Sequence, residues 1–269
     1  MTEKYKNSGQ FAKYTLVDTF DSNIEIPSKC DFDLNNIVDI EDLVYFTKEW
    51  LSAEENYSLV GYWKFNETNG SQAADSSIYA NHGSLNNDPA WTGTGELNFD
   101  GIDDYVKVPH TASLDVRNEI TVSAWVYLND YGTDWPKLVV KPHSEYASPW
   151  EIYCIDLSHY GTYPRMVITD GIPSSGAEVV ADPNFTLSLN QWYHIVGTYN
   201  GNSMSLYADG QLIAVHSTTI QIGQNDMPLS IGSRLGSHNA FKGLIDEVRI
   251  YNRALTENQV QELYQSTKK

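Results

Sequence analysis

Cysteine, basic side chains and long apolar runs are all scarce in this chain of 269 residues. With only 2 cysteines, Cys30 and Cys154, the chain has no disulfide framework. The 17 basic residues face 35 acidic ones, and the net charge of −18 argues against nucleic acid or anionic membrane as the main partner. No run approaches the roughly 18 apolar residues of a membrane span, which excludes membrane insertion. The opening MTEKYKNSGQ also lacks the apolar core of a secretory signal.

Apolar and aromatic residues, in contrast, are frequent enough to form a folded core. They make up 41% and 12% of the chain, which excludes global disorder. The pattern divides the chain into a polar segment at 1–29, a helical unit at 30–52, a polar linker at 53–58 and a β domain at 59–269. The helical unit places an apolar stripe on one face of a helix, made of Ile40, Leu43, Val44, Tyr45, Trp50 and Leu51.

From residue 59 onward, short β-branched and aromatic runs alternate with Gly and Asn turns, which favours a mainly β sandwich or jelly roll. Asn200-Gly201 and Asp209-Gly210 predict a three-stranded meander joined by two-residue type I′ turns. Thr256 and Gln259 have the spacing of a capping box and predict a short C-terminal helix. The expected strands are 59–65, 96–99, 105–108, 120–128, 137–141, 150–156, 165–169, 191–199, 203–208, 211–216, 229–231 and 244–251.

A carboxylate-rich stretch at 31–42 has the ligand spacing of an EF-hand calcium loop. Its oxygen donors occupy positions 1, 3, 5, 9 and 12 of a twelve-residue window, and a backbone carbonyl falls at position 7. Asn36 replaces the usual glycine at position 6, and asparagine tolerates the left-handed conformation required there. The simpler alternative is an acidic first turn of a helix, which suits the helix dipole. The predicted calcium ligands are Asp31, Asp33, Asn35, the Ile37 carbonyl, Asp39 and Asp42.

The aspartate at the last ligand position makes Cys30–Leu51 resemble a dockerin repeat, the calcium loop and helix of secreted bacterial carbohydrate-active proteins. Dockerins usually carry two repeats, and residues 1–29 contain no second loop. The resemblance therefore implies a calcium-stabilised spacer, with docking to a protein partner through this helical unit as the alternative.

The later segments GYWKFNETNGSQAADSSIYANHGSL, LNFDGIDDYVKVP, ITVSAWVYL, QWYHIVGTYNGNSMSLYADGQLI and GLIDEVRIYNRALTENQV resemble a laminin-G-like domain, over Leu59–Gln265. This family has the concanavalin A-like jelly roll. The resemblance implies two antiparallel sheets, with the strand near Trp63 beside the last strand near Val248. It also implies a structural calcium at Asp246, with Asp100-Gly101 and Asp103 as further ligands; the alternative is a turn and a solvent-facing strand residue.

Loops rich in aromatic residues are the candidates for binding a saccharide. Aromatic rings stack on the apolar faces of sugars, and amide or carboxylate groups bind their hydroxyls. Trp63, Trp125 and Trp192 lie within strand patterns and are expected in the core, while loops more often carry function. The candidate sugar-binding residues are Tyr131, Asp134, Trp135, Tyr146, Trp150, Tyr160 and Tyr163, with His143 and His159 beside them.

A catalytic motif is missing from the sequence. Glycoside hydrolases of this fold carry a Glu-x-Asp-x-Glu strand, which aims two carboxylates into one cleft. The nearest match, Glu151 and Asp156, has an odd offset, so on a regular strand the two face opposite sides; Asp246 and Glu247 fail for the same reason. Cys154 lies in an apolar strand and is expected to be packed rather than nucleophilic. We therefore expect no enzymatic activity.

Together these features predict a non-catalytic carbohydrate-binding or adhesion module, stabilised by calcium and working outside the cell or at its surface. Its expected partner is a polysaccharide or a cell-surface glycan. Two alternatives stay open: a structural subunit that self-assembles into a surface layer, sheath or filament, and a degenerate glycoside hydrolase.

Overall fold

The protein is described by a computed structural model, which covers residues 40, 42, 57–132, 135–144, 148–158, 162–173, 176–180, 185–236 and 239–269. The chain divides into two compact units, Met1–Ser52 and Ala53–Lys269. In the first unit, Ile40 and Asp42 are helical, and Asp42 is buried with 2% exposure. The other residues of the predicted calcium loop lie outside the described residues, so that loop stays a prediction.

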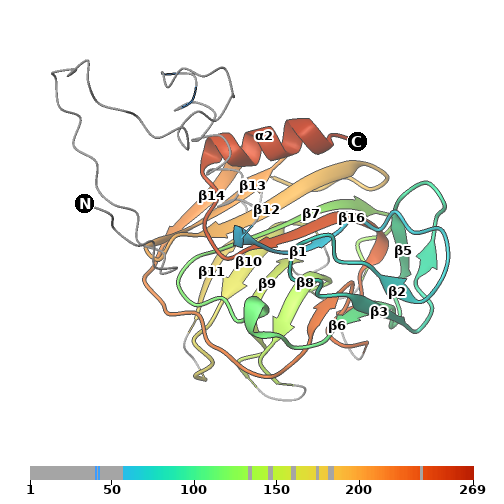
Figure 1. Cartoon of the computed structure of the whole chain (residues 1–269), viewed down its shortest axis with the longest axis horizontal. Helices are drawn as coiled ribbons and strands as arrows, with labels where there is room; N and C mark the ends of the chain where they lie inside the picture. Colours follow the sequence, from blue (N-terminus) through green and yellow to red (C-terminus); the bar gives the residue numbers. More distant parts are fainter. Residues whose placement is uncertain are drawn as a thin grey trace, which may run out of the picture. The chain divides into compact units, whose positions relative to one another are not determined.

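The second unit contains two antiparallel sheets, which we call sheet A and sheet B (Figure 1). Sheet A has the order β14-β13-β12-β7-β16-β5-β4, with β1 paired to β16. Its strands are β1 (Leu59–Trp63), β4 (Ala90–Trp91), β5 (Leu97–Asp100), β7 (Ile120–Leu128), β12 (Trp192–Tyr199), β13 (Ser203–Ala208), β14 (Gln211–Ser217) and β16 (Lys242–Tyr251).

Sheet B has the order β11-β10-β9-β8-β15-β6-β3-β2. A short 3₁₀ helix, η2 (Ala112–Leu114), follows β6. The strands of sheet B are β2 (Gln72–Ala73), β3 (Gly83–Asn86), β6 (Tyr105–Val108), β8 (Lys137–Pro142), β9 (Glu151–Leu157), β10 (Pro164–Ile168), β11 (Ala177–Val180) and β15 (Leu229–Ile231).

The main core lies between the two sheets and takes alternate residues from each strand. In β7, for example, Ile120, Val122 and Ala124 point into this core, whereas Trp125 points to the other face of sheet A. That outer face is also covered, because the C-terminal helix α2 (Glu257–Thr267) lies along it (Figure 1). A strand buried on both faces reads as a nearly continuous apolar run, which explains the sequence of β7.

The mainly β sandwich and the C-terminal helix are confirmed. Trp63 pairs with Val248 across β1 and β16, as the resemblance implied. The meander of β12, β13 and β14 is also present. Trp63 and Trp125 are buried, while Trp192 is only half-buried, which corrects its assignment to the core.

One of the two predicted type I′ turns is wrong. Asp209 and Gly210 both have positive φ, 50° and 76°, and form the expected two-residue turn. Asn200 does not have positive φ; its side-chain oxygen instead accepts hydrogen bonds from the backbone N–H groups of Asn202 and Ser203. The connection is therefore three residues long and is organised by the asparagine side chain.

Candidate functional site

The outer face of sheet B carries a set of charged side chains that the sequence pattern did not bring together. In β9, Tyr153, Ile155 and Leu157 point into the main core, so Cys154 and Asp156 point to the opposite face. Asp156 pairs with Lys137 in β8 on one side and with Arg165 in β10 on the other. Cross-strand neighbours share a face, which places the three charges together.

Glu151 joins this set because β9 is irregular. The register with β8 shifts between Lys141 and Pro142, so that Tyr153 pairs with Lys141 but Glu151 pairs with Pro142. The extra residue at 152 turns Glu151 to the same face as Asp156. Our expectation that Glu151 and Asp156 face opposite sides was therefore wrong, because a β-bulge breaks the alternation on which it depended.

Lys137 lies at the centre of this cluster and bridges the two carboxylates. Its Nζ donates to Glu151 Oε1 at 2.6 Å and to Asp156 Oδ2 at 2.5 Å. Arg165 donates to both oxygens of Asp156, at 2.8 and 2.7 Å, and to Glu178 at 2.8 Å. We call Lys137, Glu151, Asp156 and Arg165 the charge cluster.

The charges in this cluster compensate one another despite deep burial. Burial alone would raise the pKa of Asp156, but Lys137 and Arg165 outweigh it and hold that pKa below its ordinary value. Burial would likewise lower the pKa of Lys137, and Asp156 reverses that effect and raises it. Lys137, Asp156 and Arg165 therefore stay charged at neutral pH, and each member of the cluster has an oppositely charged group in contact.

Two tryptophans lie at the two ends of the β8–β9 pair, each against an arginine. The Arg165 guanidinium lies 4.1 Å from the ring centroid of Trp135, just before β8. The Arg234 guanidinium lies 4.5 Å from that of Trp150, just before β9. Trp135 has a φ of 59°, unusual for a bulky residue, and such strain is found at binding sites more often than elsewhere. Trp150 remains 44% exposed.

The other sugar-binding candidates are distributed differently. Tyr131 is partly buried against the core and donates its hydroxyl to the Leu187 carbonyl at 3.1 Å. Tyr163 also packs partly against the core. His143 is half-buried near Gly171. Asp134, Tyr146, His159 and Tyr160 lie outside the described residues, so their role stays a prediction.

The predicted calcium ligands of the β unit do not all meet. Asp100, Asp103 and Asp104 form a cluster in which one oxygen of each lies within 4.8 Å of the others, and Gly101 makes the turn with a φ of 80°. Asp100 pairs with Lys242 in β16, four residues before Asp246. Asp246 instead forms an ion pair with Lys269 at the end of the chain, and its role as a calcium ligand stays a prediction.

Asp104, which the sequence analysis did not select, is the buried member of this cluster. It is 3% exposed, and its Oδ1 is buried without a hydrogen-bond partner among the described residues. Its Oδ2 accepts from the Asp100 backbone N–H at 2.9 Å. Burial raises the pKa of Asp104 to about 6, and the nearby carboxylates of Asp100 and Asp103 contribute to the rise. Hard oxygen donors of this kind suit Ca²⁺.

Three groups in the described residues have side chains that could serve in catalysis, and each is paired or buried. Glu151 and Asp156 lie close enough for glycosidase chemistry, yet both are neutralised by Lys137. Cys154 is a free, buried thiol whose pKa burial raises well above its ordinary value, as expected for a packed cysteine. His194 meets Ser123 at 2.8 Å, but burial lowers the pKa of His194 to about 3, and helix α2 covers the pair.

The two antiparallel sheets form a jelly roll of the concanavalin A-like type. The family model described as "Concanavalin A-like lectin/glucanases superfamily" matches residues 100–261, more than half of the chain. The chain belongs to this family. Membership includes glucanases, so it does not itself decide between binding and catalysis.

Among curated proteins, the chain is 30% identical to pentraxin-related protein PTX3 of Mus musculus over 128 residues, 43% of this chain and 32% of that protein. It thus spans about a third of the length of this relative.

Solved structures share the fold at low sequence identity. The binding domain of botulinum neurotoxin serotype D has a TM-score of 0.61 at 15% identity and covers 79% of this chain and 52% of its own. The binding domain of Paraclostridial Mosquitocidal Protein 1 has a TM-score of 0.57 at 19% identity, and the match covers 78% of this chain and 52% of that one. A third similar structure is domain 4 of AbnA, an extracellular arabinanase of Geobacillus stearothermophilus, solved in complex with arabinotriose. Its TM-score is 0.57 at 19% identity, and the match covers 77% of this chain and 98% of that one.

Trp135 and Trp150 were predicted from the sequence, whereas the arginines that contact them were not. Arg165 could have been found from its alternation with the core residues Met166 and Ile168. Arg234 follows β15, which lies beside β8 in sheet B but far from it in sequence, and no local pattern indicates that neighbour.

Proposed function

We propose that this chain is a non-catalytic glycan-binding module whose binding surface is the outer face of sheet B. The observation that carries the proposal is the pair of tryptophans, Trp135 and Trp150, each stacked on an arginine at opposite ends of β8 and β9. Stacked and charge-anchored rings lose little conformational entropy when a sugar binds to them. The family assignment and the arabinotriose complex of the similar AbnA domain support this proposal.

The length and charge of this surface favour a neutral oligosaccharide. From the Lys137–Asp156 pair to the Pro142–Glu151 pair the ladder runs five residues, about 16 Å at 3.3 Å per residue. That length exceeds a single sugar ring and has room for several. The charge cluster is internally compensated and the whole chain carries −18, so neither attracts a polyanionic glycan.

The test is a glycan array followed by calorimetry on the best neutral ligand. We expect Trp135→Ala and Trp150→Ala each to weaken binding by roughly 1–2 kcal/mol, about 5- to 30-fold, because each removes a stacking surface. Trp91→Ala on sheet A is the matched control and should leave affinity unchanged. Absence of binding across a broad array, together with self-association lost in the same two variants, would favour the structural subunit instead.

We further propose that the module binds calcium and works outside the cell. The unpartnered Asp104 Oδ1 beside Asp100 and Asp103 supports a cation in the β unit. The ligand spacing at 31–42 supports a second one in the N-terminal unit, as a spacer of the dockerin type. The description of the similar arabinanase as extracellular agrees with that location. In the described residues no helix is long and apolar enough to cross a membrane.

A further inference from the structure

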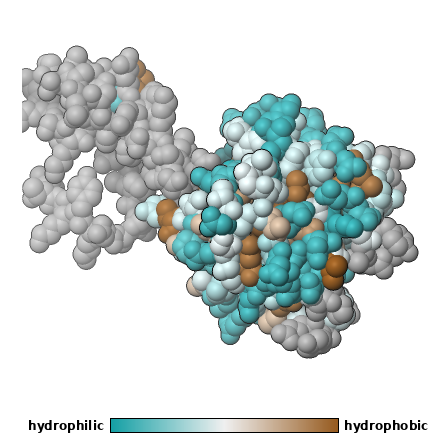
Figure 2. Space-filling model, turned by 90° about the vertical axis from the view of Figure 1, so that its right-hand side faces the viewer, coloured by the Kyte–Doolittle hydropathy of each residue, from teal (hydrophilic) through white to brown (hydrophobic). Residues whose placement is uncertain are grey.

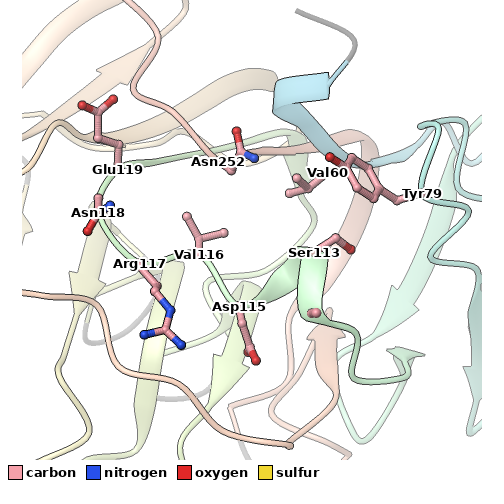
Figure 3. A pocket seen from close by; sticks show the side chains of 10 residues that line it. Val60, Tyr79, Ser113, Asp115, Val116, Arg117, Asn118, Glu119 and Asn252 are labelled. Atoms are coloured by element: carbon pink, nitrogen blue, oxygen red, sulfur yellow. The ribbon is translucent and has the colours of Figure 1, made fainter. Parts of the chain in front are cut away.

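Figure 3 shows a pocket whose lining shares no residue with the charge cluster; its volume is about 410 Å³. Its wall comes from four parts of the chain: β1, the connection between β2 and β3, the segment from η2 to β7, and the residue after β16. A volume of this size lies at the lower end of small-molecule sites, which suits one or two sugar units. The lining includes Val60, Tyr79, Val116, Arg117, Asn118 and Asn252.

The frame of this pocket is fixed by contacts over long sequence distances. Val60 and Val116 are buried members of the main core, and in Figure 3 the side chain of Val116 points into the pocket. The Arg117 carbonyl accepts from the Ile222 N–H at 3.0 Å, and the Asn252 N–H donates to the Ser58 carbonyl at 2.9 Å. The backbone on both sides is therefore held in place before any ligand arrives.

The polar groups at the rim, in contrast, are unused. Asn118, Asn252 and Arg117 are exposed, and within the described part of the chain their side chains make no hydrogen bond or ion pair. Each amide offers two donors and an acceptor. Two free amides on either side of an apolar floor can bind neighbouring hydroxyl groups, which donate and accept at once.

An aromatic ring completes the pocket. Tyr79 is 38% exposed, and its hydroxyl is anchored by a hydrogen bond of 2.9 Å to the Tyr57 carbonyl, which restrains the ring. A restrained ring beside amides can pack on the apolar face of a sugar. The lining holds two acids, Asp115 and Glu119, and one base, Arg117, so it offers an anion no net positive charge.

From this arrangement we infer that the pocket is a second binding site, for a neutral saccharide unit, and that it works independently of the outer face of sheet B. Asn118 and Asn252 bind the hydroxyls, Val60 and Val116 form the floor, and Tyr79 is the stacking wall. The chain then holds a glycan at two separate points, which raises the avidity for a branched or multivalent ligand.

Nuclear magnetic resonance on the ¹⁵N-labelled full chain tests this inference. The probes are methyl glycosides of glucose, galactose, mannose and arabinofuranose, with glucuronate and glucosamine as charged comparisons. We expect at least one neutral glycoside to shift the side-chain amide signals of Asn118 and Asn252 at millimolar concentration. Asn118→Ala/Asn252→Ala should weaken that binding about tenfold or more. Asn69→Ala, an exposed amide far from the pocket lining, is the control and should change nothing.

The second arm separates this site from the proposed function. In Trp135→Ala/Trp150→Ala the side-chain amide signals of Asn118 and Asn252 should still shift, even if binding on the array is lost. If that variant does not fold, the wild-type chain answers the same question when the signals of the pocket and those of the sheet B surface are followed separately. The inference is overturned if no neutral glycoside shifts these signals, if a charged probe shifts them more strongly, or if the response disappears with the two tryptophans. Loss of array binding with an intact pocket response agrees with both proposals. Tryptophan variants that bind the array as tightly as the wild type would contradict only the sheet B site.

Discussion

His194 is a buried polar residue on a strand face that the sequence pattern predicts to be apolar. It lies in β12 on the outer face of sheet A, with Trp125 at a centroid distance of 5.1 Å and Tyr264 of α2 at 6.1 Å. Its Nε2 meets Ser123 Oγ at 2.8 Å, and Nδ1 has no hydrogen-bond partner among the described residues. The imidazole is therefore an uncharged packing group that must remain neutral in the folded protein.

This environment predicts a specific pH dependence of stability. Burial, helped by the nearby charge of Arg249, lowers the pKa of His194 from 6.5 to about 3. The unfolded chain takes up a proton below about pH 6.5 while the folded chain does not, so the stabilisation present above that pH is lost as the pH falls. Each pH unit costs about 1.4 kcal/mol. Between pH 6.5 and pH 5, we expect His194→Gln to lose about 1–2 kcal/mol less than the wild type.

Urea unfolding of both proteins across this range checks the prediction. Asp104 and Asp246, whose pKa values burial raises to about 6, act in the opposite direction, but both remain in the variant and cancel in the difference. Parallel curves for the wild type and His194→Gln would show that His194 is not held neutral.

Lys137 is the residue on which the charge cluster depends. It is 2% exposed and contacts both Glu151 and Asp156. Without Lys137, Arg165 is the one remaining cation of the cluster. Removing one partner of a buried ion pair typically costs about 3–5 kcal/mol. We expect Lys137→Met to lower the free energy of unfolding by about that amount, measured by urea denaturation.

Lys107 provides the matched control, because it is an exposed lysine of β6 in the same sheet. Lys107→Met should change stability by less than about 0.5 kcal/mol. If Lys137→Met were as mild as this control, the cluster would not be the buried ion network that its distances indicate.

At the scale of elements, helix α2 begins where its sequence predicts. Thr256 and Gln259 form both halves of the capping box, and Val260 is buried against sheet A. A lost threonine cap costs about 1 kcal/mol. We expect Thr256→Ala to destabilise the β unit by about this amount, and Thr256→Ser, which keeps the hydroxyl, to be nearly neutral. Equal denaturation midpoints for the Ala and Ser variants would contradict the role of the cap.

Strands were predictable where apolar or aromatic residues lie between clear turns. β6, β7, β13 and β15 have the bounds expected from the sequence, because each combines β-branched or aromatic residues with clear turns. β2 and β4 have two residues each, too short to show any period, and were missed, as were β3 and β11.

The candidate site was less predictable because irregular geometry creates it. The bulge in β9 moves Glu151 across the sheet, and a bulge leaves no signal in the order of residues. The contact of Arg234 with Trp150 likewise depends on the neighbouring position of β15 and β8. Composition could indicate that aromatic loops bind sugar, but only the register could show what supports the rings.

At the scale of the whole molecule, the chain carries a net charge of −18. Figure 2 shows hydrophilic residues over most of one face of the β unit, with hydrophobic residues only in small separate groups. Such a surface keeps a protein soluble. Exposed carboxylates are common on it, so a cluster of carboxylates is a candidate metal site only when one of them is buried. Asp104 meets that condition, with 3% exposure and an unpartnered oxygen.

Calcium should therefore stabilise the β unit through the Asp104 cluster and not through Asp246, which Lys269 already neutralises. A ligand at 100 times its dissociation constant adds about 2.7 kcal/mol, and each kcal/mol raises Tm by about 2–4 °C in a domain of this size. We expect Ca²⁺ to raise the Tm of the chelator-treated full chain by about 5–10 °C. Asp104→Asn should remove that rise, whereas Asp246→Asn and the exposed control Asp88→Asn should keep it. A helical circular dichroism signal that still responds to Ca²⁺ in Asp104→Asn would come from the loop at 31–42. If the rise in Tm were kept in Asp104→Asn and lost in Asp246→Asn, the calcium ligands would instead be those predicted from the sequence alone.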